Sequence, residues 1–152
     1  MWIVIRHTSP CASVLRPKKN EMMALTTALI WFGVITLITL ATEIMFTYAT
    51  KGFGFGFSSN RPVVEKSPLG LRIERVYRNQ VESAAYIVPI LGGGAVMGVN
   101  SPAIQIAALL VVLGRAAFCA LFYSGLPFVR VLAFVLANFS LVYILFVLAT
   151  TG

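Results

Sequence analysis

The sequence predicts an all-α integral membrane protein built as a bundle of four transmembrane helices. The first observation is composition: 59% of the 152 residues are hydrophobic and 11% are charged, whereas a soluble domain carries about 25% charged residues. The second is that four apolar stretches are each long enough to cross a hydrocarbon layer about 30 Å thick. The third is that the last two connections are short, which indicates antiparallel neighbouring helices.

One domain is expected over residues 22–150, with spans at 22–48, 73–99, 102–123 and 127–149. The first span contains a single charge, Glu43. The third is predicted to begin with Ser101 as its N-cap and Pro102 in its first turn, because both residue types favour those positions. The fourth is predicted to begin at Pro127, directly after a tight connector.

Two segments lie outside the spans. Residues 1–21 form a basic lead that we expect to be disordered or interfacial, with Met22 and Met23 as alternative starts. The long loop, residues 49–72, contains KGFGFGFSSNRP. Its phenylalanines are expected at the membrane interface, because the glycine alternation lacks the spacing of a phosphate-binding loop. Gly94 and Gly98 have a GxxxG spacing, which indicates either close helix approach or simple tolerance of glycine in a membrane helix.

The charge pattern excludes several function classes. The net charge is +7 and the chain has no aspartate, but in a membrane protein basic residues collect in loops and at lipid headgroups. No nucleic-acid-binding module is recognisable, so nucleic acid is not an expected partner. The two cysteines and one histidine have no metal-type spacing, which argues against a zinc site or a histidine-based triad. The arginines within the helices favour the long-loop side as cytoplasmic.

The second span opens with charged and polar residues in the stretch LRIERVYRNQVE. Four of them follow the spacing i, i+3, i+4 and i+7, which places them on one face of a helix: Arg75, Arg78, Asn79 and Glu82. Arg115 in the third span and Arg130 in the fourth lie at a similar depth from the same end. Ionisable groups inside a bilayer cost several kcal/mol unless they are paired or hydrated, so such a group marks a functional site.

Together these residues predict a polar, positively charged pocket between helices. Arginine grips carboxylate or phosphate with two parallel hydrogen bonds, so the pocket suits an anionic ligand. Asn79 can donate and accept hydrogen bonds, and Glu82 can receive an ammonium group. In the alternative interpretation Arg78 and Glu82 satisfy each other and Arg130 extends to the headgroups. Arg115 fits that alternative least, because it lies about two turns before the end of its span.

The same residues resemble the MAPEG family, the membrane-associated proteins in eicosanoid and glutathione metabolism, over about residues 22–150. That family has four transmembrane helices and an Arg-x-x-Arg-x-x-x-Asn-x-x-Glu signature at the start of the second helix. Arg72, Arg75, Asn79 and Glu82 fill the signature here. In a second register, based on the likeness of ERVYRNQV to one synthase branch, Glu82 takes the asparagine position and Ala85 the glutamate position. We prefer the first register, which keeps both polar residues.

The resemblance implies a homotrimer that binds glutathione, as co-substrate, between adjacent protomers. It assigns glutathione binding to residues on two helices: Arg75, Arg78, Asn79, Glu82 and Arg115. It assigns catalysis to Arg130, which would activate the thiol, and to Tyr123. Phe118 departs from the family pattern, because some members have histidine or tyrosine at its position.

The implied activity is a glutathione-dependent membrane transferase or peroxidase acting on a lipophilic electrophile or hydroperoxide that arrives from membrane lipid. Because one branch of the family presents lipids without catalysis, the alternative is a scaffold that binds a lipid or another membrane protein. The chain is expected to be a multi-pass protein of a bacterial inner membrane, with the endoplasmic reticulum as the alternative.

Overall fold

The computed structural model describes residues 23–59, 65–99 and 101–151, so the prediction for residues 1–21 lies outside the described part. Every regular element in the described part is a helix, as predicted. The elements are α1 (Met23–Lys51), α2 (Phe53–Phe57), α3 (Pro68–Val96), α4 (Pro102–Ser124) and α5 (Pro127–Thr151). Four of these helices are long, and α2 is a five-residue helix within the predicted long loop, residues 49–72.

Three of the four long helices are long and apolar enough to cross a membrane: Ala24–Lys51, Pro102–Ser124 and Pro127–Thr151. They confirm a multi-pass integral membrane protein. The helix α3 is also 29 residues long, but its first half carries the charged and polar residues around Asn79, so it is not apolar enough to qualify as a span. The polar residues of the bundle are therefore concentrated on one helix.

Local sequence signals explain where the helices begin. The helix α3 begins at Pro68, before the expected residue 73, because the Ser67 hydroxyl accepts a hydrogen bond from the Gly70 amide at 3.2 Å. Ser101 caps α4 as predicted, accepting from the Ile104 amide at 3.3 Å. Serine followed by proline provides an N-cap and a residue suited to the first turn.

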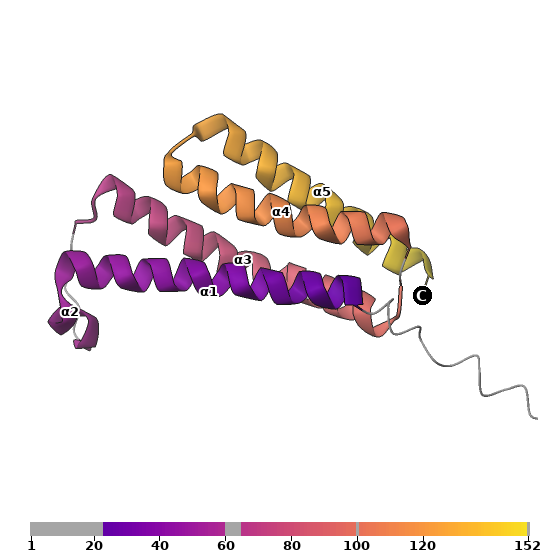
Figure 1. Cartoon of the computed structure of the whole chain (residues 1–152), viewed down its shortest axis with the longest axis horizontal. Coiled ribbons are helices and arrows are strands. Elements are labelled where there is room, and N and C mark those ends of the chain that lie inside the picture. Colours follow the sequence, from indigo (N-terminus) through magenta and orange to yellow (C-terminus); the bar gives the residue numbers. More distant parts are fainter. Residues whose placement is uncertain (1–22, 60–64, 100, 152) are drawn as a thin grey trace, which may run out of the picture.

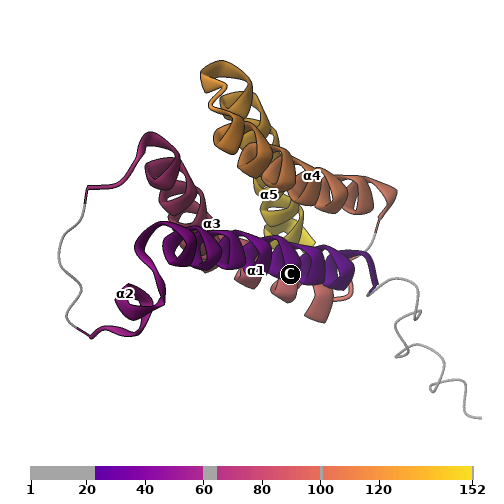
Figure 2. The same ribbon diagram turned by 60° about the vertical axis from the view of Figure 1, so that its left-hand side comes forward.

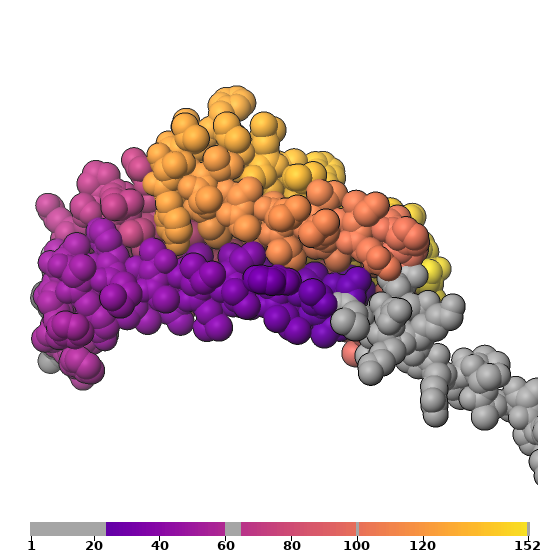
Figure 3. All heavy atoms as spheres, viewed as in Figure 1, coloured from indigo at the N-terminus to yellow at the C-terminus, as the bar shows by residue number. Residues whose placement is uncertain are grey.

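The helices pair as α1 with α3 and α4 with α5, and α1 also packs along α4 (Figure 1). In the space-filling view the indigo surface of α1 borders the orange surface of α4 (Figure 3). The turn between α4 and α5 lies at the same end of the bundle as α2 and the start of α3 (Figures 1 and 2). The start of α1 and the end of α5 lie at the other end, in agreement with antiparallel neighbours.

The buried apolar residues form two clusters. The larger joins α1, α3, α4 and α5 around residues such as Leu25, Leu91 and Ile144. The smaller contains Val76 and Phe118 and lies closer to the polar residues of α3. Large apolar side chains also cover the outer surface of α5, which is the expected state of a helix that faces lipid.

Glycine permits close approach at two points in the bundle. A Cβ on Gly114 of α4 would lie 2.9 Å from the Ala133 carbonyl oxygen and 2.9 Å from the Ala137 Cβ of α5. A Cβ on Gly94 would lie 2.9 Å from Leu25 Cδ1. Gly98 lies beyond the end of α3 with φ 66°, so the close-approach interpretation of the GxxxG spacing is wrong for Gly98.

We predict that Gly114→Ala lowers the free energy of unfolding by about 1–3 kcal/mol, because the new methyl group overpacks the contact between α4 and α5. Gly93→Ala is the matched control, since nothing lies within 4 Å of a Cβ at that helical position. We expect it to be neutral or to stabilise by about 0.5–1 kcal/mol. Reversible unfolding in mixed micelles measures both. Equal stability of the two variants would contradict the packing described here.

Candidate functional site

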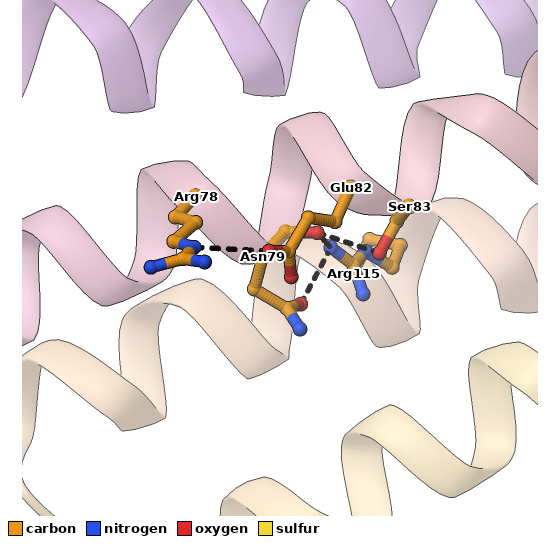
Figure 4. A network of polar contacts seen from close by, with 5 residues as sticks. All are labelled: Arg78, Asn79, Glu82, Ser83 and Arg115. Carbon is orange, nitrogen blue, oxygen red and sulfur yellow. Dashed lines mark hydrogen bonds and ion pairs between the residues drawn. The ribbon is translucent and has the colours of Figure 1, made fainter.

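The polar centre of the bundle is the guanidinium group of Arg115 on α4, whose residue is 1% exposed. Its Nη2 donates to the Asn79 side-chain oxygen at 3.0 Å and to Gln80 Oε1 at 2.5 Å. Its Nε donates to Gln80 Oε1 at 3.1 Å. A further bond of 3.3 Å joins Nη2 to the Asn79 carbonyl oxygen (Figure 4). In the described part of the chain, all these acceptors are neutral oxygens.

Aromatic rings cover the remaining sides of this guanidinium. Its Cζ atom lies 5.3 Å from the ring centroid of Phe118 and 5.9 Å from that of Phe134, where the ring faces attract a cation. Two further donors, Arg115 Nη1 and Gln80 Nε2, are buried without a hydrogen-bond partner among the described residues. The network therefore retains two N–H donors that can donate hydrogen bonds to an oxygen atom of a ligand or of water.

The network continues along α3 towards the surface. The Ser83 hydroxyl donates to the Asn79 carbonyl oxygen at 2.7 Å, and the Tyr86 hydroxyl donates to the Ser83 oxygen at 3.1 Å. The Asn79 carbonyl thus receives hydrogen bonds from both Ser83 and Arg115. Asn79 is the link between the interior of the bundle and the exposed side of α3.

The exposed side of α3 carries four residues that we name the outer stripe: Arg75, Arg78, Glu82 and Tyr86. Within it, Arg78 Nε donates to Glu82 Oε1 at 3.0 Å, with the two side chains 76% and 60% exposed (Figure 4). The other helices of the chain leave this face uncovered. The stripe is therefore accessible to a ligand or to a second copy of the chain.

The other two predicted site residues lie elsewhere. The carbonyl of Tyr123 accepts a hydrogen bond from Arg72 at 3.4 Å, and its hydroxyl lies towards Thr42 of α1. The guanidinium of Arg130 stacks on Phe122, 4.3 Å from the ring centroid.

The structure thus brings together Asn79 and Arg115, and it pairs Arg78 with Glu82. It leaves Arg75 exposed on the same side of α3. Within the described residues, no hydrogen bond or ion pair joins the side chain of Tyr123 or Arg130 to these groups. One chain alone therefore does not assemble all the predicted residues around one ligand.

Gln80 was not predicted as a site residue, yet it is fully buried and accepts two hydrogen bonds from Arg115. A signal was present. The buried residues of α3 recur every three or four positions, as Ile73, Val76, Gln80, Ser83 and Ile87. A glutamine on such an apolar seam indicates a hydrogen-bonded interior group, because an unsatisfied buried amide is costly.

Comparison with known proteins assigns the family. The model of the MAPEG family matches residues 25–150, nearly the whole described part of the chain. The chain belongs to the MAPEG family. No curated protein and no solved structure matches it. Membership makes it a membrane protein related to glutathione and eicosanoid metabolism, in a family of which many members are glutathione transferases or synthases.

We predict that Gln80→Leu destabilises the protein by about 3–5 kcal/mol, because it leaves the Arg115 charge buried with fewer acceptors. The double variant Gln80→Leu with Arg115→Met should lose less than the sum of the two single variants, since both partners are then apolar. Unfolding in mixed micelles measures this cycle. Simple additivity would contradict a direct interaction between the two side chains.

Proposed function

We propose that this MAPEG protein binds glutathione at the outer stripe and acts as a glutathione-dependent membrane transferase or peroxidase. The observation that carries the proposal is the exposed Arg78–Glu82 pair, which lies on the same segment of α3 as Asn79, a hydrogen-bond partner of the buried Arg115. An exposed ion pair on a bundle this apolar needs a polar partner, because lipid chains offer none. A zwitterionic, anionic peptide supplies that partner.

The chemistry of glutathione matches the stripe group by group. Glutathione carries two carboxylates and one ammonium group, joined by peptide amides. The guanidinium groups of Arg75 and Arg78 suit the carboxylates, and Glu82 suits the ammonium. The Asn79 amide can donate to or accept from a peptide group. Arg115, behind the stripe, adds positive potential and holds Asn79 in place.

We further propose that the complete site forms between copies of the chain in a homotrimer. Arg130 and Tyr123 do not contact the outer stripe of their own chain, and that stripe is uncovered. Packing the stripe against a neighbouring protomer removes its charges from lipid and gives Arg130 of that neighbour a route to the ligand. The outer stripe of one protomer and the Arg130 surface of its neighbour would thus form a single interface.

In this mechanism Arg130 stabilises the glutathione thiolate. A free thiol has a pKa of about 8.5, and a nearby guanidinium favours the ionised, nucleophilic form. The sulfur then forms a bond to an electrophilic carbon while the leaving group departs with its electron pair. With a lipid hydroperoxide, the thiolate sulfur attacks the terminal peroxide oxygen, the O–O bond breaks, and the lipid alkoxide takes a proton and leaves as an alcohol. The glutathione sulfur is left as a sulfenic acid, and the thiol of a second glutathione displaces its hydroxyl group as water to form the disulfide. The stripe contributes by holding the peptide in position.

A non-catalytic scaffold is the second candidate, and two contacts favour it. Phe118 occupies a position where some family members carry histidine or tyrosine, and its ring packs on Arg115. Phe122 occupies the face of Arg130. A protein with these contacts can present a lipid or bind another membrane protein through the same polar surface without activating a thiol.

We predict that Arg78→Ala and Glu82→Ala each weaken glutathione binding about tenfold or more, equal to about 1.4 kcal/mol. Each variant removes one charged partner of the peptide. Calorimetry on detergent-purified protein measures the affinity. Lys51→Ala is the control, because Lys51 is exposed at the end of α1. Unchanged affinity in both stripe variants, or no binding by the folded native protein, would exclude the glutathione site.

We predict that Arg130→Ala lowers kcat/KM for a model electrophile by about 10²-fold, since it removes one preorganised donor, while glutathione affinity changes little. Subunits carrying Arg130→Ala, mixed with subunits carrying Arg78→Ala, should recover part of the activity. Such recovery requires a site shared between protomers. Glutathione binding without turnover by the native protein would favour the scaffold.

A further inference from the structure

A cavity of about 230 Å³ lies between the second half of α1 and α2, away from the outer stripe. Its lining residues are Leu40, Glu43, Ile44, Thr47, Tyr48 and Gly56. We name it the α2 cavity. It lies at the end of the bundle where α2 is placed beside α1 (Figure 2). The proposed glutathione chemistry uses none of its residues.

The carboxylate of Glu43 gives this cavity a negative charge. The described cation that acts on this carboxylate electrostatically is Lys66, which already forms an ion pair with Glu74 at 2.8 Å. These three side chains therefore sum to one negative charge, within a chain whose net charge is +7. A half-buried carboxylate in a membrane helix requires a partner, and the partner that fits this local balance is a cation.

One aromatic ring lines the cavity, that of Tyr48. The ring of Tyr48 stacks on Phe53 with centroids 5.0 Å apart and on Phe57 with centroids 6.2 Å apart. Aromatic faces attract ammonium groups, and carbon-substituted ammonium ions above all. Gly56 allows α2 to approach closely, because a Cβ at that position would overlap the Tyr48 ring.

The position of Glu43 along α1 indicates the source of the cation. From Met23, the first residue of α1, to Glu43 the helix rises about 30 Å, which equals the thickness of the hydrocarbon layer. Glu43 therefore lies at the level where lipid chains give way to headgroups. Leu40 and Ile44 offer apolar contacts on either side of it. The volume is below the roughly 300–1,000 Å³ of sites for drug-sized molecules, so it suits a headgroup.

We propose that the α2 cavity binds an alkylammonium group, with Glu43 as its counter-ion and Tyr48 as its aromatic wall. The group is supplied by the ethanolamine headgroup of a membrane lipid or by a free amphiphilic amine. Both share the same chemistry, a positively charged nitrogen bonded to carbon and belonging to an amphiphilic molecule. The proposal is independent of glutathione binding, because the cavity and the outer stripe lie on different helices.

The test uses the full chain purified in a neutral detergent. Native mass spectrometry compares dioleoylphosphatidylethanolamine with dioleoylphosphatidylglycerol, which has the same chains without the ammonium. Calorimetry with octyltrimethylammonium bromide provides the free-amine arm. The variants are Glu43→Gln, which removes the charge, and Gly56→Ala, which displaces Tyr48. Gly54→Ala is the matched control, because nothing lies within 4 Å of its Cβ.

We expect binding of at least one ammonium compound to fall about tenfold or more in Glu43→Gln and Gly56→Ala and to stay unchanged in Gly54→Ala. If the variants weaken binding of the phospholipid more than binding of the free amine, the ammonium group comes from a bilayer lipid. If they weaken binding of the free amine more, it comes from a soluble amphiphile. Circular dichroism and thermal unfolding establish that the variants are folded. Equal binding by the native protein and folded Glu43→Gln, or equal retention of phosphatidylglycerol, would overturn the proposal.

Discussion

The buried guanidinium of Arg115 is the constraint on which the rest of the bundle depends. A charge at this depth costs several kcal/mol unless its donors are satisfied. Its acceptors are the oxygens of Asn79 and Gln80, so α3 must present two consecutive residues to α4 at one height. Hydrogen bonds weaken steeply when misaligned. The pairing therefore fixes both the rotation of α3 and its position along the bundle axis.

Once its rotation is fixed, α3 separates its polar residues onto two faces. Gln80 and Ser83 are buried, whereas Arg78 and Glu82 are exposed and Asn79 is half-buried between the two faces. Figure 4 shows Arg78, Glu82, Asn79 and Ser83 along α3. The interaction that stabilises the interior therefore also orients the outer stripe. A substitution at Gln80 acts on two properties at once, since a rotated α3 would move the exposed ion pair as well as leave a charge unsatisfied.

The features that could be predicted from the sequence are those encoded locally. Serine followed by proline placed the start of α4, and helical spacing placed Arg78 and Glu82 on one face. Features that depend on packing were not predictable. The stacking of Arg130 on Phe122 depends on how α5 leaves the preceding turn. The five-residue helix α2 is too short to show a hydrophobic period, and it depends on contacts with Tyr48.

The charges around α3 also bear on which ligand the outer stripe would favour. The Arg78–Glu82 ion pair must separate when glutathione binds. Arg78 then pairs with a ligand carboxylate and Glu82 with the ligand ammonium, so two ion pairs with the ligand replace one within the protein. The gain in selectivity then comes from the uncompensated cations, Arg75 on the stripe and Arg115 behind it. Glutathione has one net negative charge at neutral pH, because it carries two carboxylates and one ammonium. The attraction exerted by the buried Arg115 is screened little, whereas that exerted by the exposed Arg75 weakens as salt is added. It therefore favours an anionic peptide over a neutral one of the same size.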